Sequence, residues 1–250
     1  MTTSRPGAPS APPGGHPTFG APGDGPEVLV FDLYGTLVDP LDVVSTLGEV
    51  IPGDEAADVA ALWRRTQLDY AFRLTLMGRY RTFEWVTARA LDHALDATGH
   101  DLADEVRRAL LQAYDRLALY PDVRPALELL VERGHDCYVL SNGSPGMLRR
   151  SLESAGLTGF FSGWISVDEV GAFKPAPQVY RHAGEVIGRV VTSMRMVSCN
   201  PFDVVGAAAA GMRTAWVNRS GRPFDRIGER PDLMGSDLVD LAHRITAVSA

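Results

Sequence analysis

The clearest chemical signal in the sequence is a carboxylate at the end of an apolar run. Asp32 follows the segment "VLVF" and precedes "YGT", so it stands where a buried strand gives way to a turn. Gly35 permits a tight turn, and Thr36 can hydrogen-bond the carboxylate and hold one of its oxygens. A lone aspartate after a strand can be a solvated turn residue, but this pattern favours a nucleophile.

Lys174 is the only lysine in the sequence, where every other Lys or Arg position is arginine. A compact ammonium group fits beside a nucleophilic carboxylate where a planar guanidinium would not. It would also keep that carboxylate ionised in a closed pocket. The alternative is an incidental surface lysine. We expect Lys174 to lie beside Asp32.

Two adjacent arginines in a predicted helix differ in their neighbours. Arg64 has no acidic residue three or four positions away, whereas Arg65 has Asp69 four positions later. We therefore expect Arg64 to point inwards and Arg65 to be solvated. An inward guanidinium could bind a leaving halide and stabilise the charge that grows on it. The alternative is an arginine whose stem only covers apolar surface.

The elements that must position these residues are short apolar runs alternating with helical stretches. The runs lie at 28–32, 137–142, 163–167, 194–200 and 213–218. From 137 onwards they are separated by enough residues for crossover helices, which predicts a doubly wound α/β fold with a parallel sheet. The stretch from 40 to 120 has helical periodicity without strand-like alternation.

The chain is therefore expected to have two domains and a tail. The α/β core comprises residues 27–39 and 121–250, and an inserted helical cap comprises residues 40–120. Residues 1–26 are half Pro and Gly, which predicts a disordered tail, and they lack the apolar segment of a signal peptide.

Ligands of open α/β sheets bind beyond the carboxyl ends of the strands. Polar residues follow each predicted strand there, at Asp32, at 141–142, before Lys174 and at 198–200. The segment "SNGSP" also joins a strand to a helix start, with Ser144 as the N-cap and proline next. Free backbone N–H groups at such a junction form an anion site.

Together, "FDLYGTL", "LSNGSP", "KP" and a later aspartate resemble the motifs of the haloacid dehalogenase superfamily, whose aspartate forms a covalent intermediate. Most members are magnesium-dependent phosphatases with a second aspartate at the position of Tyr34 and an acidic cluster near the fourth strand. That cluster reads "SCNPFD" here, which leaves only Asp203. We therefore expect no metal site and no cofactor.

These departures are shared with the L-2-haloacid dehalogenase (type II) family. The segments "ALWRRTQLDY", "LMGRY", "KPAPQVY" and "WVNRSG" also resemble that family in order and spacing, and the similarity extends over residues 28–220. The resemblance implies metal-independent hydrolysis of short L-2-haloalkanoates to D-2-hydroxy acids through an ester on Asp32. Relatives often carry glutamine where this chain has Arg65, so the substrate range could differ.

The resemblance also implies roles for particular residues. Ser141 and nearby N–H groups would hold the substrate carboxylate, and Arg64, Asn142 and Phe202 would surround the halide. Tyr180 would hydrogen-bond near Lys174. The implied catalytic set is Asp32, Thr36, Arg64, Ser141, Asn142, Lys174, Tyr180, Ser198, Asn200 and Asp203, the last three supporting the pocket and the hydrolytic water. The implied substrate contacts are Tyr34, Arg64, Leu68, Phe83, Ser141, Asn142 and Phe202, although core packing alone would account for Phe83.

Two alternatives to dehalogenation stay open on the sequence. The same nucleophile and carboxylate cradle could open a strained 2-carboxylated ring by C–N cleavage, and a non-catalytic binding protein could share the fold. Turnover with chloride release separates the three.

The net charge, the cysteines and the length of the apolar runs limit the partners and the cellular compartment that the sequence predicts. A net charge of −7, a pI near 5.4 and no run of more than two basic residues argue against nucleic acid and favour a small-molecule partner. Cys137 and Cys199 match no metal or redox spacing, which indicates reduced thiols. No apolar run is long enough to cross a membrane. We expect a cytoplasmic protein, and the resemblance suggests a homodimer.

Overall fold

A six-stranded parallel sheet forms the centre of the computed structural model, which describes residues 25–249. The strand order is β3-β2-β1-β4-β5-β6, with every neighbouring pair parallel. The strands are β1 (Val28–Phe31), β2 (Asp136–Ser141), β3 (Gly163–Ser166), β4 (Met194–Ser198), β5 (Arg213–Val217) and β6 (Leu233–Gly235). The predicted parallel α/β fold is confirmed. Of the predicted tail, residues 1–24 lie outside the described residues.

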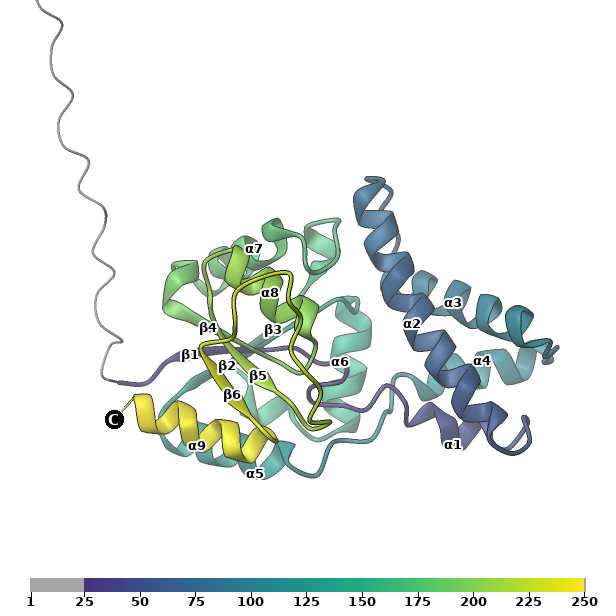
Figure 1. The fold of residues 1–250 in the computed structure, drawn as a ribbon, viewed down its shortest axis with the longest axis horizontal. Coiled ribbons are helices and arrows are strands. Elements are labelled where there is room, and N and C mark those ends of the chain that lie inside the picture. The colour runs from purple at the N-terminus through teal and green to yellow at the C-terminus, as the bar shows by residue number, and fades with distance from the viewer. Residues whose placement is uncertain (1–24, 250) are drawn as a thin grey trace, which may run out of the picture.

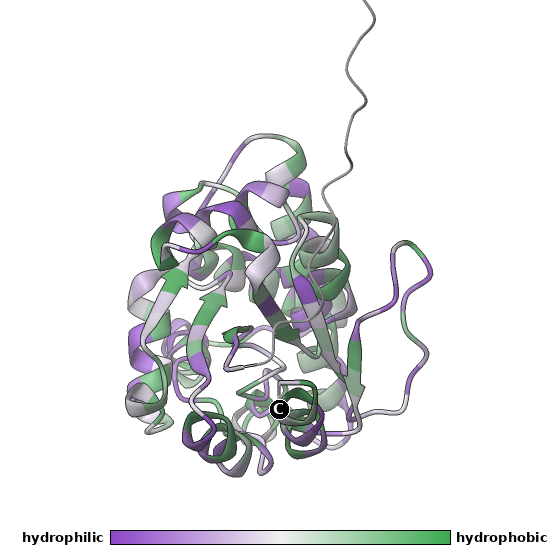
Figure 2. Ribbon diagram, turned by 90° about the vertical axis from the view of Figure 1, so that its left-hand side faces the viewer, coloured by the Kyte–Doolittle hydropathy of each residue, from purple (hydrophilic) through white to green (hydrophobic). Residues whose placement is uncertain are grey.

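The helices of the core cover both sides of this sheet. Figure 1 shows α5 and α9 on one side and α7 and α8 on the other, and each pair packs together. Both faces of the sheet are therefore buried, which explains why the strands read as continuous apolar runs. In Figure 2 hydrophobic colour gathers on these strands. The core helices are α5 (Val123–Glu132), α6 (Pro145–Ser154), α7 (Pro177–Ile187), α8 (Pro201–Ala209) and α9 (Leu238–Val248).

Four further helices are inserted between β1 and α5 and lie beside the sheet (Figure 1). The long helices α2 and α3 pack against each other, and Trp63 of α2 donates its indole N–H to Thr87 O of α3 at 2.8 Å. The two chain segments that lead in and out run side by side, bridged at Val38 and Leu119. The inserted helices are α1 (Val43–Leu47), α2 (Glu55–Leu76), α3 (Phe83–Thr98) and α4 (Asp104–Ala113).

A buried ion cluster lies at the amino edge of the sheet; we call Glu27, Arg195 and Arg213 the amino-edge cluster. Arg195 donates two hydrogen bonds to Glu27, from Nε to Oε2 at 2.7 Å and from Nη2 to Oε1 at 3.0 Å. Arg213 Nη1 lies 3.3 Å from Glu27 Oε1. Burial opposes ionisation of Glu27, but the two guanidinium groups hold the pKa of that carboxyl below its usual value.

Candidate active site

The carboxyl ends of β1, β2 and β4 bring most of the predicted site residues to one edge of the sheet. Asp32 follows β1 and continues its ladder, donating its N–H to Val197 O of β4 at 3.0 Å. Ser141 ends β2, and Ser198 ends β4. Since parallel strands end at the same edge, residues more than a hundred positions apart meet there.

The Asp32 carboxylate has two unequal oxygens. Oδ2 accepts from Asn200 Nδ2 at 2.7 Å and from Thr36 Oγ1 at 3.0 Å, with Ser198 Oγ at 3.5 Å. Oδ1 accepts only from Lys174 Nζ, at 3.2 Å, among the described residues. The Asp32 side chain is 9% exposed. One oxygen is thus held by several donors, whereas the other has a single partner.

Lys174 lies between two buried carboxylates, and we call Asp32, Lys174 and Asp203 the carboxyl-edge cluster. Its Nζ lies 3.2 Å from Asp32 Oδ1 and 2.9 Å from Asp203 Oδ2. Burial opposes the ammonium charge, but attraction to Asp203 and Asp32 raises the pKa of Lys174. The expectation that Lys174 lies beside Asp32 is confirmed, and the side chain is 1% exposed.

The second carboxyl of this cluster, that of Asp203, has a raised pKa. Tyr180 donates its hydroxyl to Asp203 Oδ1 at 2.8 Å, so Tyr180 joins the cluster through Asp203. Burial and the nearby charge of Asp32 raise the pKa of Asp203 to about 6, although Lys174 and the Tyr180 hydrogen bond act in the opposite direction. Two carboxylates share one ammonium group, and the excess negative charge makes one of them easy to protonate.

Arg64 points inwards from α2, as expected, and reaches the loop after Asp32. Its Nη1 donates to Gln67 Oε1 at 2.7 Å, and its Nη2 lies 3.4 Å from Tyr34 O. Gln67 is fully buried and was not predicted; it also donates to Thr87 Oγ1 at 2.7 Å and accepts from Tyr114 at 2.9 Å. Its position one helical turn after Arg64 is the signal that could have identified it.

Arg65 is exposed, as expected. Its suggested partner Asp69 accepts instead from Arg73 Nε at 3.0 Å, four residues further along the same helix face. The acidic residue after Arg65 therefore pairs with a later arginine. The direction of Arg64, however, was inferred correctly from its own lack of acidic neighbours.

Ser141 and Asn142 lie beside the cluster. Ser141 is fully buried, and Asn142 Oδ1 accepts from Lys174 N at 2.9 Å, which holds the lysine's backbone. The backbone N–H groups of Leu33 and Tyr34 have no acceptor within residues 25–249. Ser144 caps α6 by accepting from Met147 N at 3.3 Å, as predicted. Hydrogen-bond donors thus remain next to Asp32.

The predicted apolar contacts divide into two groups. Leu68 and Phe202, together with Asn200, line a cavity of about 470 Å³ next to the loop that follows Asp32. Tyr34 and Phe83 are buried against each other instead, with ring centroids 5.7 Å apart. The two aromatic residues are not among the residues that line this cavity, and their role as substrate contacts stays a prediction.

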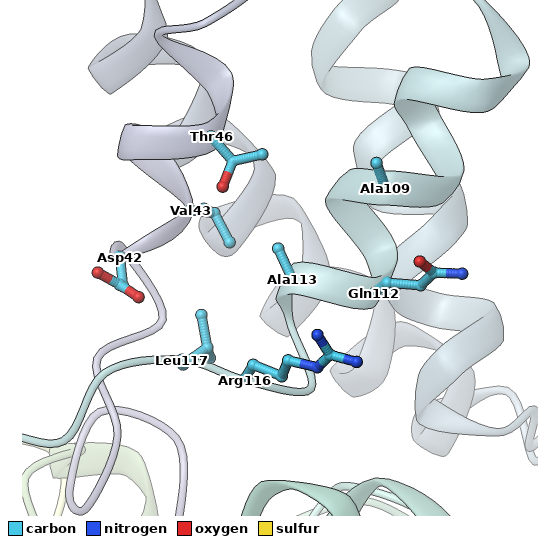
Figure 3. Close-up of a pocket in the computed structure, with 8 residues that line it drawn as sticks. All are labelled: Asp42, Val43, Thr46, Ala109, Gln112, Ala113, Arg116 and Leu117. Carbon is cyan, nitrogen blue, oxygen red and sulfur yellow. The ribbon is translucent and has the colours of Figure 1, made fainter. Parts of the chain in front are cut away.

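A separate cavity of about 310 Å³ lies between α1 and α4 (Figure 3). None of the predicted site residues lines it. Its lining residues are Asp42, Val43, Thr46, Ala109, Gln112, Ala113, Arg116 and Leu117.

Arg219 is a further residue at the site that the sequence analysis did not single out. It lies in the segment after β5 and donates from Nη1 to Gly35 O at 3.2 Å and from Nη2 to Thr36 O at 2.9 Å. It lay within the quoted segment "WVNRSG", but nothing in its local spacing relates it to residues 35 and 36.

Comparisons with known proteins agree with this geometry. A sequence model of the haloacid dehalogenase-like hydrolases matches residues 26–211. The fold and the matched segment place the chain in that class of hydrolases.

Similar proteins narrow the class. Haloacetate dehalogenase H-2 of Moraxella sp. (strain B) is 38% identical over 88% of this chain and 97% of its own length. The (S)-2-haloacid dehalogenase of Pseudomonas sp. (strain YL) is 39% identical over 82% of this chain and 88% of its own length. The L-2-haloacid dehalogenase of Xanthobacter autotrophicus, solved with chloropropionic acid covalently bound, has a TM-score of 0.82 at 34% identity, covering 88% of this chain and 98% of its own.

The chain belongs to the L-2-haloacid dehalogenase family of the haloacid dehalogenase superfamily. The family predicted from the motifs is thereby confirmed. Within residues 25–249, no helix is both long enough and apolar enough to cross a membrane.

Proposed function

We propose that this protein hydrolyses the carbon–halogen bond of short L-2-haloalkanoic acids and releases D-2-hydroxy acids, with Asp32 as the nucleophile. The observation that carries the proposal is the unequal bonding of the Asp32 carboxylate. Thr36 and Asn200 hold Oδ2, whereas Oδ1 accepts from the Lys174 ammonium group alone within residues 25–249. Relatives named (S)-2-haloacid dehalogenases and the covalent chloropropionic acid complex of one relative support it.

The substrate carboxylate would bind at the donors beside Asp32. Ser141 and the N–H groups of Leu33 and Tyr34 could hold it, because those N–H groups have no acceptor among the described residues. Arg64, Asn142 and Phe202 would surround the halide. A guanidinium group there stabilises charge as it develops on the leaving atom. Tyr34, Leu68 and Phe83 would contact the alkyl group.

The reaction then has two steps. Asp32 Oδ1 attacks the α-carbon opposite the halogen, and the halide leaves with the bonding electron pair, giving an ester with inverted configuration. Water next attacks the carbonyl carbon of that ester and loses one proton to Asp203. The bond from that carbon to the alkyl oxygen then breaks, and the second proton of the water passes to the leaving alkoxide, which restores the Asp32 carboxylate and frees the hydroxy acid. Lys174, hydrogen-bonded to both carboxylates, places a positive charge beside Asp32 Oδ1 before the attack. Ser198 and Asn200 would hold the ester carbonyl and the water.

Isotope labelling tests the nucleophile. After multiple turnovers in ¹⁸O-water, mass analysis of the peptide that carries "FDLYGTL" should find heavy oxygen in Asp32. In a single turnover with excess enzyme, the new hydroxyl should carry mostly light oxygen. An unlabelled Asp32 after many turnovers would show instead that Asp32 activates water directly.

Substrate screening tests the reaction itself. Chloride release from (S)-2-chloropropionate is expected. Opening of 2-carboxylated heterocycles without dehalogenation would support the C–N hydrolase, and binding without turnover would support the non-catalytic protein. The curated relatives favour neither alternative.

We also propose that the activity requires no metal. Magnesium prefers oxygen acceptors, whereas Asp32 Oδ2 is bonded by the donors of Thr36 and Asn200, and an ammonium group supplies the local positive charge. No group of three or more His, Cys, Asp or Glu side chains suited to a metal occurs within residues 25–249. Activity should therefore survive exhaustive EDTA treatment. Loss of turnover that magnesium restores would contradict this.

The remaining proposals concern organisation. We propose that residues 40–120 form a cap domain on a core of residues 27–39 and 121–250. We propose a homodimer through the cap, supported by exposed apolar side chains at Leu76, Met77 and Trp85; light scattering after gel filtration would test it. The unpaired Cys137 and Cys199 support a reducing compartment such as the cytoplasm.

A further inference from the structure

The loop that follows Asp32 accepts hydrogen bonds from several residues outside it, among them Arg219. Cys199 Sγ lies 2.7 Å from Gly35 O, and Asn200 Nδ2 donates to Tyr34 O at 3.0 Å. Arg219 donates to two successive carbonyl oxygens of that loop, those of Gly35 and Thr36, at 3.2 and 2.9 Å. Gly35 has φ +90°, and glycine is the residue with the widest backbone freedom. Backbone hydrogen bonds within the loop, such as Gly35 N to Val38 O at 2.7 Å, close the turn, and the Arg219 contacts hold its carbonyl oxygens from outside.

Arg219 is itself fixed on its remaining sides. Its Nε donates to Asp122 Oδ2 at 2.9 Å, and its guanidinium lies 4.1 Å from the ring centroid of Tyr120. Asp122 Oδ2 also accepts from Leu238 N at 2.6 Å, at the start of α9. The planar fork of arginine suits this arrangement, because it presents several donors at fixed angles.

The second carboxylate oxygen of Asp122, the residue that holds Arg219, indicates that this ion pair does more than fill space. Asp122 Oδ1 is buried and has no hydrogen-bond partner among the described residues. A buried oxygen without a partner is costly. Asp122 also balances the charge of Arg219, so the arginine adds little net charge near the nucleophile.

The contact continues from the loop to the reacting carboxylate. Thr36 Oγ1 accepts from Cys199 N at 2.9 Å, which directs its own O–H towards Asp32 Oδ2 at 3.0 Å. Moving the Thr36 backbone would therefore move the hydroxyl that holds Oδ2. Arg219 does not itself bond to Asp32.

We propose that Arg219, anchored by Asp122 and Tyr120, is a positioning residue that aims Asp32 at the substrate by clamping the carbonyl oxygens of Gly35 and Thr36. The kinetic part of this inference rests on the proposed dehalogenase function. Small misplacements of a reacting group are costly, because attack needs close contact and alignment.

Steady-state kinetics on (S)-2-chloropropionate test the clamp. In Arg219→Ala, kcat should fall about 100-fold, because the attacking carboxylate is misplaced. KM should rise much less than kcat falls, although the Leu33 and Tyr34 N–H groups belong to the same loop. Added guanidinium chloride, far below denaturing concentrations, should restore part of kcat. The kcat of Arg219→Lys should lie between those of the wild type and Arg219→Ala, because one ammonium group cannot span both carbonyl oxygens with the same geometry. Arg226→Ala, an exposed arginine in the same segment, is the matched control and should match the wild type.

A crystal structure of Arg219→Ala supplies a readout that does not depend on turnover. The Gly35–Thr36 turn should shift and the Thr36–Asp32 hydrogen bond should lengthen beyond 3.0 Å. If the wild type dehalogenates and Arg219→Ala keeps its kcat, the clamp is refuted and the function stands. If the wild type releases no chloride but the turn shifts, the dehalogenase function fails and the positioning role stands. An unmoved turn refutes the clamp in either case.

Discussion

The two edges of the same sheet carry buried ion clusters of opposite charge balance. At the amino edge one carboxylate, Glu27, meets the guanidinium groups of Arg195 and Arg213. At the carboxyl edge two carboxylates, Asp32 and Asp203, share the Lys174 ammonium group. Burial opposes ionisation of both carboxyls, more strongly for the fully buried Asp203 than for Glu27, which is 7% exposed. The two guanidinium groups nonetheless lower the pKa of Glu27, whereas the pKa of Asp203 is raised.

The difference shows how charge balance separates a structural site from a reactive one. An excess of cations keeps a buried carboxylate ionised and fully hydrogen-bonded, and bidentate arginine suits that task. A shortage of cations leaves one carboxylate oxygen weakly bonded and a second carboxyl ready to accept a proton. A buried carboxyl whose pKa is raised by a nearby carboxylate is typical of a functional site. Four experiments test this comparison.

The largest effect should follow Lys174→Arg, which keeps the charge but replaces the compact ammonium group. We expect kcat to fall by about 1,000-fold, because a guanidinium group cannot bridge Asp32 and Asp203 in the same buried space. Arg195→Lys, the exchange at the other edge, is the control and should keep kcat per folded molecule. Near-normal kcat/KM in Lys174→Arg would mean that the lysine is incidental.

At the amino edge the effect should be on stability instead. Arg195→Met removes the bidentate partner of Glu27, and we expect a loss of about 3 kcal/mol in the free energy of unfolding, measured with urea. Activity per folded molecule should not change. Arg213→Met should cost less, because that side chain is 31% exposed. A drop in kcat for folded Arg195→Met would show that the two edges are coupled.

The pH dependence of stability should have opposite signs at the two edges. Folded Asp203 keeps its proton up to about pH 6, whereas the unfolded chain releases it near 3.8, so this group makes stability fall as pH rises through that window. In the folded protein the pKa of Glu27 lies below its usual value of 4.5, so the stability that this carboxylate contributes is lost as pH falls.

Unfolding free energies of Glu27→Gln and Asp203→Asn, compared with the wild type between pH 3.5 and 7, measure these slopes. Each proton contributes at most about 1.4 kcal/mol per pH unit. If the difference in unfolding free energy between wild type and variant changes with pH in the same direction for both variants, the two clusters do not differ in charge balance as described.

The smallest effect concerns Tyr180→Phe. The Tyr180 hydroxyl stabilises the ionised form of Asp203, so its loss should raise the pKa of that carboxyl further. Because Asp203 acts in the hydrolytic step, we expect the acidic limb of kcat to move up by about half a unit to one unit relative to the wild type. Phe173→Leu, a buried aromatic change beside Lys174 in sequence, is a control for packing. A limb that stays in place would show that Asp203 does not set it.

The sequence by itself determined the parallel α/β architecture, because five of its strands are apolar runs at crossover spacing. It also indicated the Asp32–Lys174 pair, because a single lysine among arginines is visible without any structure. The strand β6 was missed because three residues are too short to show a period.

Only the tertiary structure decided which polar residues work together over long separations. Gln67 links Arg64 to Thr87, and Arg219 clamps the turn at Gly35 from the far side of the sequence. The amino-edge cluster likewise joins Glu27 to Arg195 across 168 positions. Local spacing reports which side chains share a face of one element. Glu27 and Arg195 meet because parallel strands align distant residues at the same sheet edge, whereas Gln67 meets Thr87 because α2 packs against α3.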